Sequence, residues 1–104
     1  MVSDFELPTP TKVATMNLAQ LRDTHQELVV MITKQLADIL FCIEKLFAGQ
    51  ITSDNHVEIA YHEVYVKAND LLTVFYIALE VSHHAYLESH RILAQIEKDK
   101  INNG

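Results

Sequence analysis

The residues best suited to chemistry lie in one stretch, "LEVSHHAYLESHR" (residues 79–91), which holds three histidines, two glutamates and an arginine. Imidazole and carboxylate groups bind zinc and iron, and they also act as general acids and bases. At about 100° per residue, four of these polar side chains share one face of a helix: Glu80, His84, Glu88 and Arg91. His83 and His90 lie on a different side. The stretch therefore does not form a single constellation of ligands.

Two arrangements within this stretch are typical of metal sites. Glu80 and His84 form an i,i+4 pair that can chelate an ion, and Glu80 with His83 matches the Glu-x-x-His pattern of di-iron bundles. A di-iron site also needs an inward-facing acid on a neighbouring helix, and the only acid at the expected level, Asp23, points away from the apolar stripe of its helix. We therefore interpret the stretch as a solvated helix face, and we expect no metal and no cofactor.

Nucleophilic catalysis has one candidate residue, Cys42, which is the only cysteine. It falls in mid-helix beside the expected core, where a thiol is usually inert. In an antiparallel register it would face roughly Ile59, with His56 and His62 about a turn to either side, but no third group would orient such a pair. The sequence also lacks a nucleophile elbow, a phosphate loop and a His-Glu-x-x-His zinc helix. We expect no catalytic residue and a protein that is not an enzyme.

The composition is that of one small globular domain. The chain has 104 residues, of which 49% are apolar and 21% charged. Eight basic against fourteen acidic residues give a formal net charge of −6, and the basic residues form no stripe for phosphate contacts, which argues against nucleic acid as a partner. The apolar runs are shorter than the ~20 residues that cross a bilayer, and the first residues lack signal-peptide features. We expect a cytoplasmic protein with no membrane contact.

Few residues in this sequence oppose a helix. Pro8 and Pro10 in "ELPTPTK" predict an extended, flexible leader over residues 1–16. Beyond this leader, only Gly49 in the interior of the chain disfavours a helix. The pattern predicts an all-α fold with one helical-bundle domain over residues 17–100.

The first long helix is expected to begin at Asn17, a favoured N-cap whose capping box Gln20 completes, and to end near Ala48. Apolar residues then recur at helical spacing and predict its buried stripe: Leu18, Leu21, Leu28, Val29, Ile32, Leu36, Ile39, Ile43 and Leu46. Thr52 or Ser53 is expected to cap a second helix. The short link between the two helices predicts an antiparallel hairpin.

The second helix is expected to continue to about residue 98. The alternative is a break at "KAND" (residues 67–70), with Asn69 or Asp70 capping a third helix. A heptad repeat and a flanking row at spacings of three and four predict a wide face that this helix turns toward the core. The heptad residues are Tyr65, Leu72, Leu79, Tyr86 and Leu93, and the flanking row includes Val64, Ala68, Leu71, Phe75 and Ala78. Together with the neighbouring Phe75, we expect Leu72 and Leu79 to lie in buried helix contacts.

Two helices alone cannot cover these apolar faces. The segment "LLTVFYIALEV" is apolar almost all the way round, and Val30, Ala37 and Phe41 add a second apolar stripe to the first helix. We favour a homodimer that forms a four-helix bundle, although a folded-back third helix or a different protein would also cover these faces. The second helix, ~69 Å long against ~48 Å for the first, would extend past its partner from roughly residue 85.

This overhang is the predicted partner-binding surface, because tyrosine and histidine at helix edges suit partly wet interfaces. Its residues are Tyr86, His90, Leu93, Ile96 and His83. Two further polar residues, His25 and Gln35, fall on the apolar stripe of the first helix. We interpret them as core polar groups that fix register or oligomeric state.

The sequence therefore predicts a small, acidic, non-enzymatic protein-interaction module of the regulator, chaperone or inhibitor type. Its expected partners are a second copy of the chain and another protein. The alternative is a ligand- or metal-binding sensor whose dimer encloses a pocket lined by His25, Gln35 and Tyr76. The fold class alone does not choose between these functions.

Overall fold

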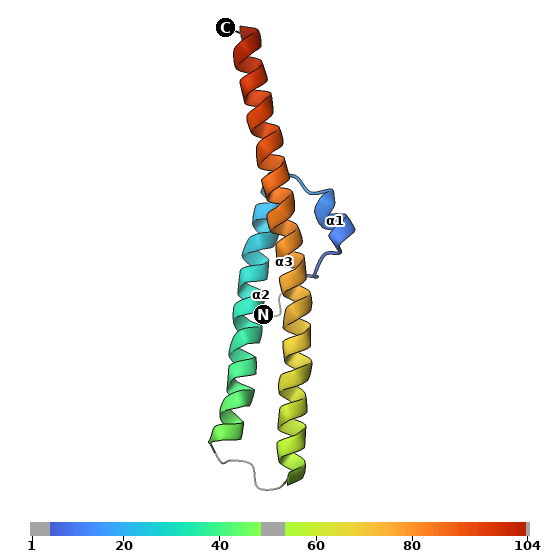
Figure 1. The fold of residues 1–104 in the computed structure, drawn as a ribbon, viewed down its shortest axis with the longest axis vertical. Coiled ribbons are helices and arrows are strands. Elements are labelled where there is room, and N and C mark those ends of the chain that lie inside the picture. Colours follow the sequence, from blue (N-terminus) through green and yellow to red (C-terminus); the bar gives the residue numbers. More distant parts are fainter. Residues whose placement is uncertain (1–4, 49–53, 104) are drawn as a thin grey trace. The chain divides into compact units, whose positions relative to one another are not determined.

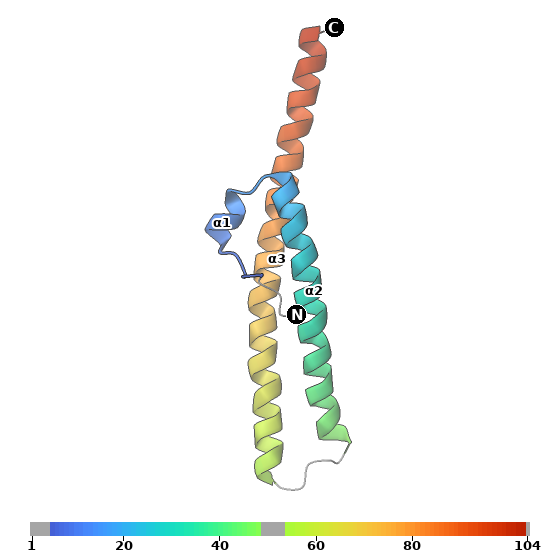
Figure 2. The same ribbon diagram turned by 180° about the vertical axis from the view of Figure 1, so that it is seen from behind.

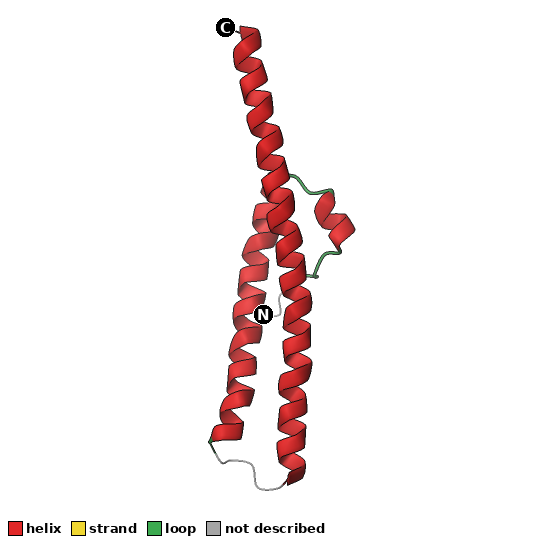
Figure 3. Ribbon diagram, in the orientation of Figure 1, coloured by secondary structure: helices red, strands yellow, loops and turns green. Residues whose placement is uncertain are grey.

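The computed structural model describes residues 5–48 and 54–103, of which 90% are helical and none forms a strand. Three helices follow one another along the chain: α1 (Pro10–Ala14), α2 (Leu18–Phe47) and α3 (Asp54–Asn103) (Figures 1 and 3). The predicted all-α class is confirmed. The turn expected at Gly49 and the cap expected at Thr52 or Ser53 lie outside the described residues.

Helix α1 lies inside the stretch that was expected to be extended. The side chain of Thr9 accepts a hydrogen bond from the backbone N–H of Lys12 (3.2 Å), and Pro10 occupies the first turn, where its missing N–H costs nothing. Val13 has no exposed surface at all. The expectation of an extended leader is therefore wrong for residues 10–14, because a local cap and one buried valine stabilise a helical turn there.

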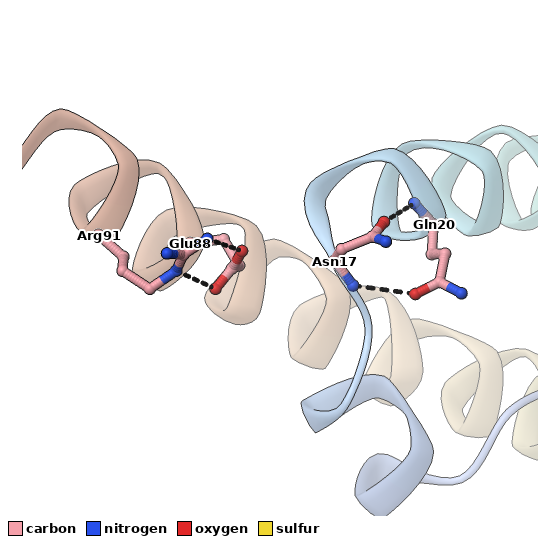
Figure 4. Close-up of polar contacts among 4 residues, drawn as sticks. All are labelled: Asn17, Gln20, Glu88 and Arg91. Atoms are coloured by element: carbon pink, nitrogen blue, oxygen red, sulfur yellow. Dashed lines mark hydrogen bonds and ion pairs between the residues drawn. The ribbon is translucent and has the colours of Figure 1, made fainter. Parts of the chain in front are cut away.

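The start of α2 confirms the predicted capping box (Figure 4). The backbone N–H of Gln20 donates to Oδ1 of Asn17 (2.9 Å), and the backbone N–H of Asn17 donates to Oε1 of Gln20 (3.0 Å). This reciprocal pair satisfies two backbone donors that the first turn leaves without an intrahelical partner. The cap explains why the helix begins at Leu18 directly after α1.

Helix α3 continues unbroken for 50 residues. Asn69 does not cap a new helix; instead its Nδ2 donates to the backbone carbonyl of Tyr65 (2.9 Å), one turn back. The hydroxyl of Thr73 bonds in the same way to the carbonyl of Asn69 (3.3 Å). The predicted continuous helix is confirmed and the alternative break at residues 67–70 is wrong. Among the described residues, no helix combines the length and apolar character that a bilayer crossing needs.

The chain divides into two compact units, to each of which α2 and α3 both contribute. Unit 1 comprises the residues up to Glu27 and those from Ile77 onward, and unit 2 comprises Leu28–Tyr76. Figures 1 and 2 show the helices from opposite sides.

Unit 2 consists of two helical segments, residues 28–47 of α2 and 54–76 of α3. The thiol of Cys42 contacts Oε2 of Glu63 at 3.7 Å. Nearer the other end of the unit, residues 35 and 38 share a pocket with residues 67 and 70, so the two segments run in opposite directions. Five apolar side chains are buried in this unit: Leu28, Ile39, Cys42, Leu71 and Val74.

Unit 1 has a small core of its own. Its buried side chains are Pro8, Val13 from α1, Leu21 and Thr24 from α2, and Ile77 and Val81 from α3. The hydroxyl of Thr24 contacts the sulfur of Met16 at 3.5 Å, which ties the α1–α2 connection to the first turns of α2. Phe5 lies there too, because it lines a shallow depression with residues 23, 24, 26 and 27. Beyond Ile92, every described residue of α3 is exposed.

The buried face of α3 is narrower than the predicted one and is centred about one residue away from the heptad positions. Leu71, Val74 and Val81 face the core, whereas Leu72 and Leu79 are 64% and 70% exposed in the single chain. Phe75 is also exposed. The single chain therefore leaves these last three residues exposed, and their expected burial in a dimer stays a prediction. The cause is that α3 carries apolar residues on two adjacent faces, and periodicity does not show which of them meets α2.

Candidate interaction surface

The five residues predicted to bind a partner lie on α3 within unit 1, and all of them are exposed. The three large apolar ones, Tyr86, Leu93 and Ile96, are 60%, 56% and 45% exposed. His83 and His90 are exposed as well. The same strip includes Leu79, which the heptad repeat had placed on the core-facing side together with Tyr86 and Leu93. We name Leu79, Tyr86, Leu93 and Ile96 the apolar strip of α3.

Histidine rings lie next to this strip. The ring of His90 packs edge-on against Tyr86, with 4.5 Å between the ring centroids. His83 is in edge contact with His84 at 5.4 Å. These contacts, one between adjacent residues and one between neighbouring turns of the helix, hold amphipathic rings at the border of the strip. Such rings can bury an apolar body while a polar atom stays in water, which suits the edge of a protein interface.

The other polar residues of the stretch form two separate pairs on α3. Nε2 of His84 lies 3.6 Å from Oε2 of Glu80. Arg91 donates two hydrogen bonds to Glu88, at 2.9 and 3.2 Å (Figure 4). These bonds to Arg91 lower the pKa of the Glu88 carboxyl below its usual value and raise the pKa of Arg91. The contribution of this pair to folding stability is therefore fully present above the unfolded-state pKa of Glu88, and it is lost as the pH falls through the folded-state pKa. Because the pair lies at the surface, this contribution is small.

The structure does not assemble a metal centre from these residues. Within residues 5–48 and 54–103, no three His, Cys, Asp or Glu side chains are placed to hold one ion together. Glu80 and His84 remain a two-member pair whose side chains are 27% and 23% exposed. Two ligands on one helix are a weak site unless a partner supplies others.

Replacing His84 with Gln is expected to change the free energy of unfolding by less than about 0.5 kcal/mol, as for most substitutions outside a core. Chelation with EDTA is expected to leave the helical circular dichroism and the melting temperature unchanged. Thermal melts with and without chelator measure both effects. Stoichiometric zinc or iron in the purified protein, lost together with helicity on chelation, would contradict the prediction.

The two predicted core polar residues have different surroundings. His25 is exposed in unit 1, so its assignment to the core is wrong for the single chain. The helix turns Leu21, Thr24 and Leu28 inward, and His25 lies about 100° away from Thr24. Gln35 is half-buried in unit 2. Its Oε1 has almost no exposed surface and no hydrogen-bond partner among the described residues.

Gln35 lines a pocket of about 180 Å³ with three charged residues, Asp38, Lys67 and Asp70. Neither His25 nor Tyr76 is among these lining residues. Sequence periodicity located Gln35 at an inward position. It could not show that charged residues from both helices line a pocket beside it.

Cys42 is buried, as expected, but its neighbour differs from the one predicted. The thiol lies opposite Glu63 rather than Ile59, at 3.7 Å from the carboxylate oxygen. The register of the two segments therefore differs by about one helical turn from the register that would place Cys42 opposite Ile59. The contact offers a weak hydrogen bond from sulfur to a carboxylate, and neither His56 nor His62 takes part in it.

The arrangement of unit 1 thus offers an exposed, aromatic-bordered apolar surface rather than a pocket with reactive groups. Comparison with known proteins does not extend this picture, since no protein-family model, curated protein or solved structure matches the chain.

Proposed function

We propose that this protein is a non-enzymatic interaction module that binds another protein through helix surfaces, in the manner of a small regulator, chaperone or inhibitor. The observation that carries the proposal is the apolar strip of α3, whose four side chains are 45% to 70% exposed. Exposed apolar residues that recur along one helix face, bordered by polar rings, are typical of a protein-binding surface.

We further propose that the chain forms a helical hairpin and that two hairpins associate as a four-helix bundle. The opposite direction of the two segments in unit 2 supports the hairpin. The number of large apolar side chains left exposed on both long helices supports the association. In a four-helix bundle each helix buries two faces, one against its own hairpin partner and one against the second copy.

A substitution pair on the strip tests the protein-binding function. Tyr86→Ala with Leu93→Asp is expected to abolish capture of the proteins that the wild-type chain retains from its native lysate, because the pair removes an aromatic anchor and adds a charge to an apolar contact. Captured proteins are identified by mass spectrometry, and binding is then repeated with the purified candidate.

Leu87→Asp is the matched control for this test. Leu87 is 45% exposed and directly follows Tyr86, but it points about 100° away from the strip. This control is expected to bind like the wild type. Equal binding by the wild type and the double variant would remove the strip as a functional site.

A second candidate function is a small-molecule sensor, and the buried, unpaired Oε1 of Gln35 beside a polar pocket is the observation that favours it. A side-chain carbonyl without a donor is a potential acceptor for a ligand N–H or O–H group. Mass spectrometry under native conditions separates the two functions, since it reports bound small species and subunit stoichiometry together. A stoichiometric ligand that is lost in Gln35→Leu would favour the sensor.

A further inference from the structure

Residues 28–47 of α2 carry a second apolar stripe beside the buried one, and this stripe differs from the one that Val30, Ala37 and Phe41 suggested in the sequence. The buried stripe contains Leu28, Ile39 and Cys42. The residues that directly follow the inward positions form a second row, and none of them is charged. This row consists of Val29, Ile32, Leu36, Leu40, Ile43 and Phe47. Ile32 and Ile43 are half-buried, and the other four are 46% to 86% exposed. The second stripe thus lies roughly 100° around the helix from the core.

Residues 54–76 of α3 repeat this arrangement. Leu71 and Val74 face the core, and the row beyond them again contains no charged residue. It consists of Val57, Tyr61, Tyr65, Ala68, Leu72 and Phe75. All except the half-buried Ala68 are 44% to 64% exposed. Their spacing of three and four residues is that of a stripe that packs against another helix.

The two stripes lie on the same side of unit 2. A right-handed helix turns clockwise as it recedes from an observer, so the second stripe of α2 is clockwise of its buried face when viewed from Leu28. The segment of α3 runs toward that observer, and the same offset is therefore counter-clockwise. Because the two buried faces point at each other, the second stripes of both segments lie on the same side of the helix pair and form one continuous surface. We name these two rows together the apolar face of unit 2.

Charged residues gather on the opposite side of this unit. By the same geometry, Lys34, Asp38 and Lys45 of α2 and Glu63 and Asp70 of α3 all lie on the other flank of the buried stripes. The pocket that contains Asp38 and Asp70 opens there too. Unit 2 is therefore amphipathic as a pair of helices, with one charged flank and one largely apolar flank, which Glu58 borders one heptad before Tyr65.

The size of the apolar face decides how it is to be interpreted. A fully exposed aromatic side chain has a surface of about 150–250 Å², and an aliphatic one somewhat less. Multiplied by the exposed fractions of the residues in the two rows, these values give an exposed surface on the order of 1,000 Å² for the apolar face. The largest apolar patch of a typical monomer is about 300–600 Å², whereas each partner in a stable interface buries about 800 Å². The face is therefore as large as half of a stable protein interface.

We infer that the apolar face of unit 2 binds the same face of a second copy of this chain. The inference rests on the proposed self-association and assigns its surface. A face without charges has no feature that would select a foreign partner by electrostatics, whereas a two-fold interface between identical apolar faces is complementary to itself. The pairing stacks two helices on two helices. It leaves the charged flank and the apolar strip of α3 in unit 1 outside the assigned surface.

Leu72→Glu and Leu36→Glu test this assignment, one on each helix. Each is expected to weaken the dimer by about a hundredfold or more, because a two-fold interface would bury two unpaired carboxylates against apolar groups. Sedimentation equilibrium across a range of protein concentrations measures the dissociation constant. Circular dichroism shows whether each variant remains helical.

The matched controls are Val66→Glu and Val30→Glu. Val66 and Val30 are 42% and 63% exposed, and they lie on the same two segments but off the apolar face. Both controls are expected to dimerise like the wild type. Equal dissociation by the control and test variants would overturn the assignment, since the effect would then not depend on the face.

Thiol reactivity tests the same interface without introducing a charged side chain. In a Cys42→Ser background, a thiol introduced by Leu72→Cys is expected to be alkylated roughly tenfold more slowly than one introduced by Val66→Cys, because it reacts only when the dimer opens. Dilution below the dissociation constant is expected to remove the difference. Equal rates while the protein is dimeric would overturn the assignment.

The outcomes separate this inference from the proposed function. A wild-type dimer that Leu72→Glu and Leu36→Glu leave intact overturns the assigned face while self-association stands. A monomeric wild type at the highest concentration tested overturns both the face and the self-association. Protein capture through the apolar strip of α3 is measured separately, and its loss in the Tyr86→Ala and Leu93→Asp double variant does not depend on unit 2.

Discussion

Leu28→Ala is expected to lower the free energy of unfolding by about 2–5 kcal/mol, the usual range for truncating a leucine in a core. Leu28 is 1% exposed and is among the largest fully buried side chains of the described residues. The substitution removes apolar contacts and leaves a cavity that two rigid helices cannot close. Urea denaturation followed by circular dichroism at 222 nm measures the loss.

Leu79→Ala is the control for this prediction. The side chain of Leu79 is 70% exposed, although the heptad pattern had assigned it to the core. At protein concentrations where the chain is monomeric, its truncation is expected to change stability by no more than about 0.5 kcal/mol. Equal losses for Leu28→Ala and Leu79→Ala under those conditions would show that the inward face of α3 has been assigned wrongly.

Val13→Asp is expected to destabilise the protein by at least about 2 kcal/mol, because it removes the burial of a valine and places a carboxylate at a site without water. Val13 is 0% exposed, and α1 has no other buried residue. Deleting residues 1–15 is expected to lower the melting temperature as well. An extended, flexible leader of the kind that Pro8 and Pro10 predict would instead leave the melting temperature unchanged on deletion.

Ala14→Asp is the matched control, since it adds the same charge to α1 at an exposed neighbouring position. It is expected to melt close to the wild-type temperature. Thermal unfolding of all three variants by circular dichroism measures the difference. If Val13→Asp and the deletion both melt at the wild-type temperature, α1 does not contribute to the core of unit 1.

The surface that we propose for partner binding was predictable from the sequence only in part. Tyr86, Leu93 and Ile96 were identified because the apolar repeat of the second helix continues past the expected end of the first, and all three are exposed. Leu79 was missed because it precedes residue 85, where the second helix was still expected to be covered by the first. The pocket beside Gln35 could not be predicted either, because residues from two helices line it.

The sequence by itself determined the two long helices, because the start of α2 and the continuity of α3 depend on groups three or four residues apart. Asn17 and Gln20 cap α2 within one turn, and Asn69 bonds back to Tyr65 within α3. Tertiary structure alone decided which apolar face is buried. Leu71 and Leu72 are equally hydrophobic neighbours, but only Leu71 faces α2. The hydrophobic effect is non-directional, so it does not favour one of these leucines over the other. Which of them is buried depends on the distance and register at which the second helix packs.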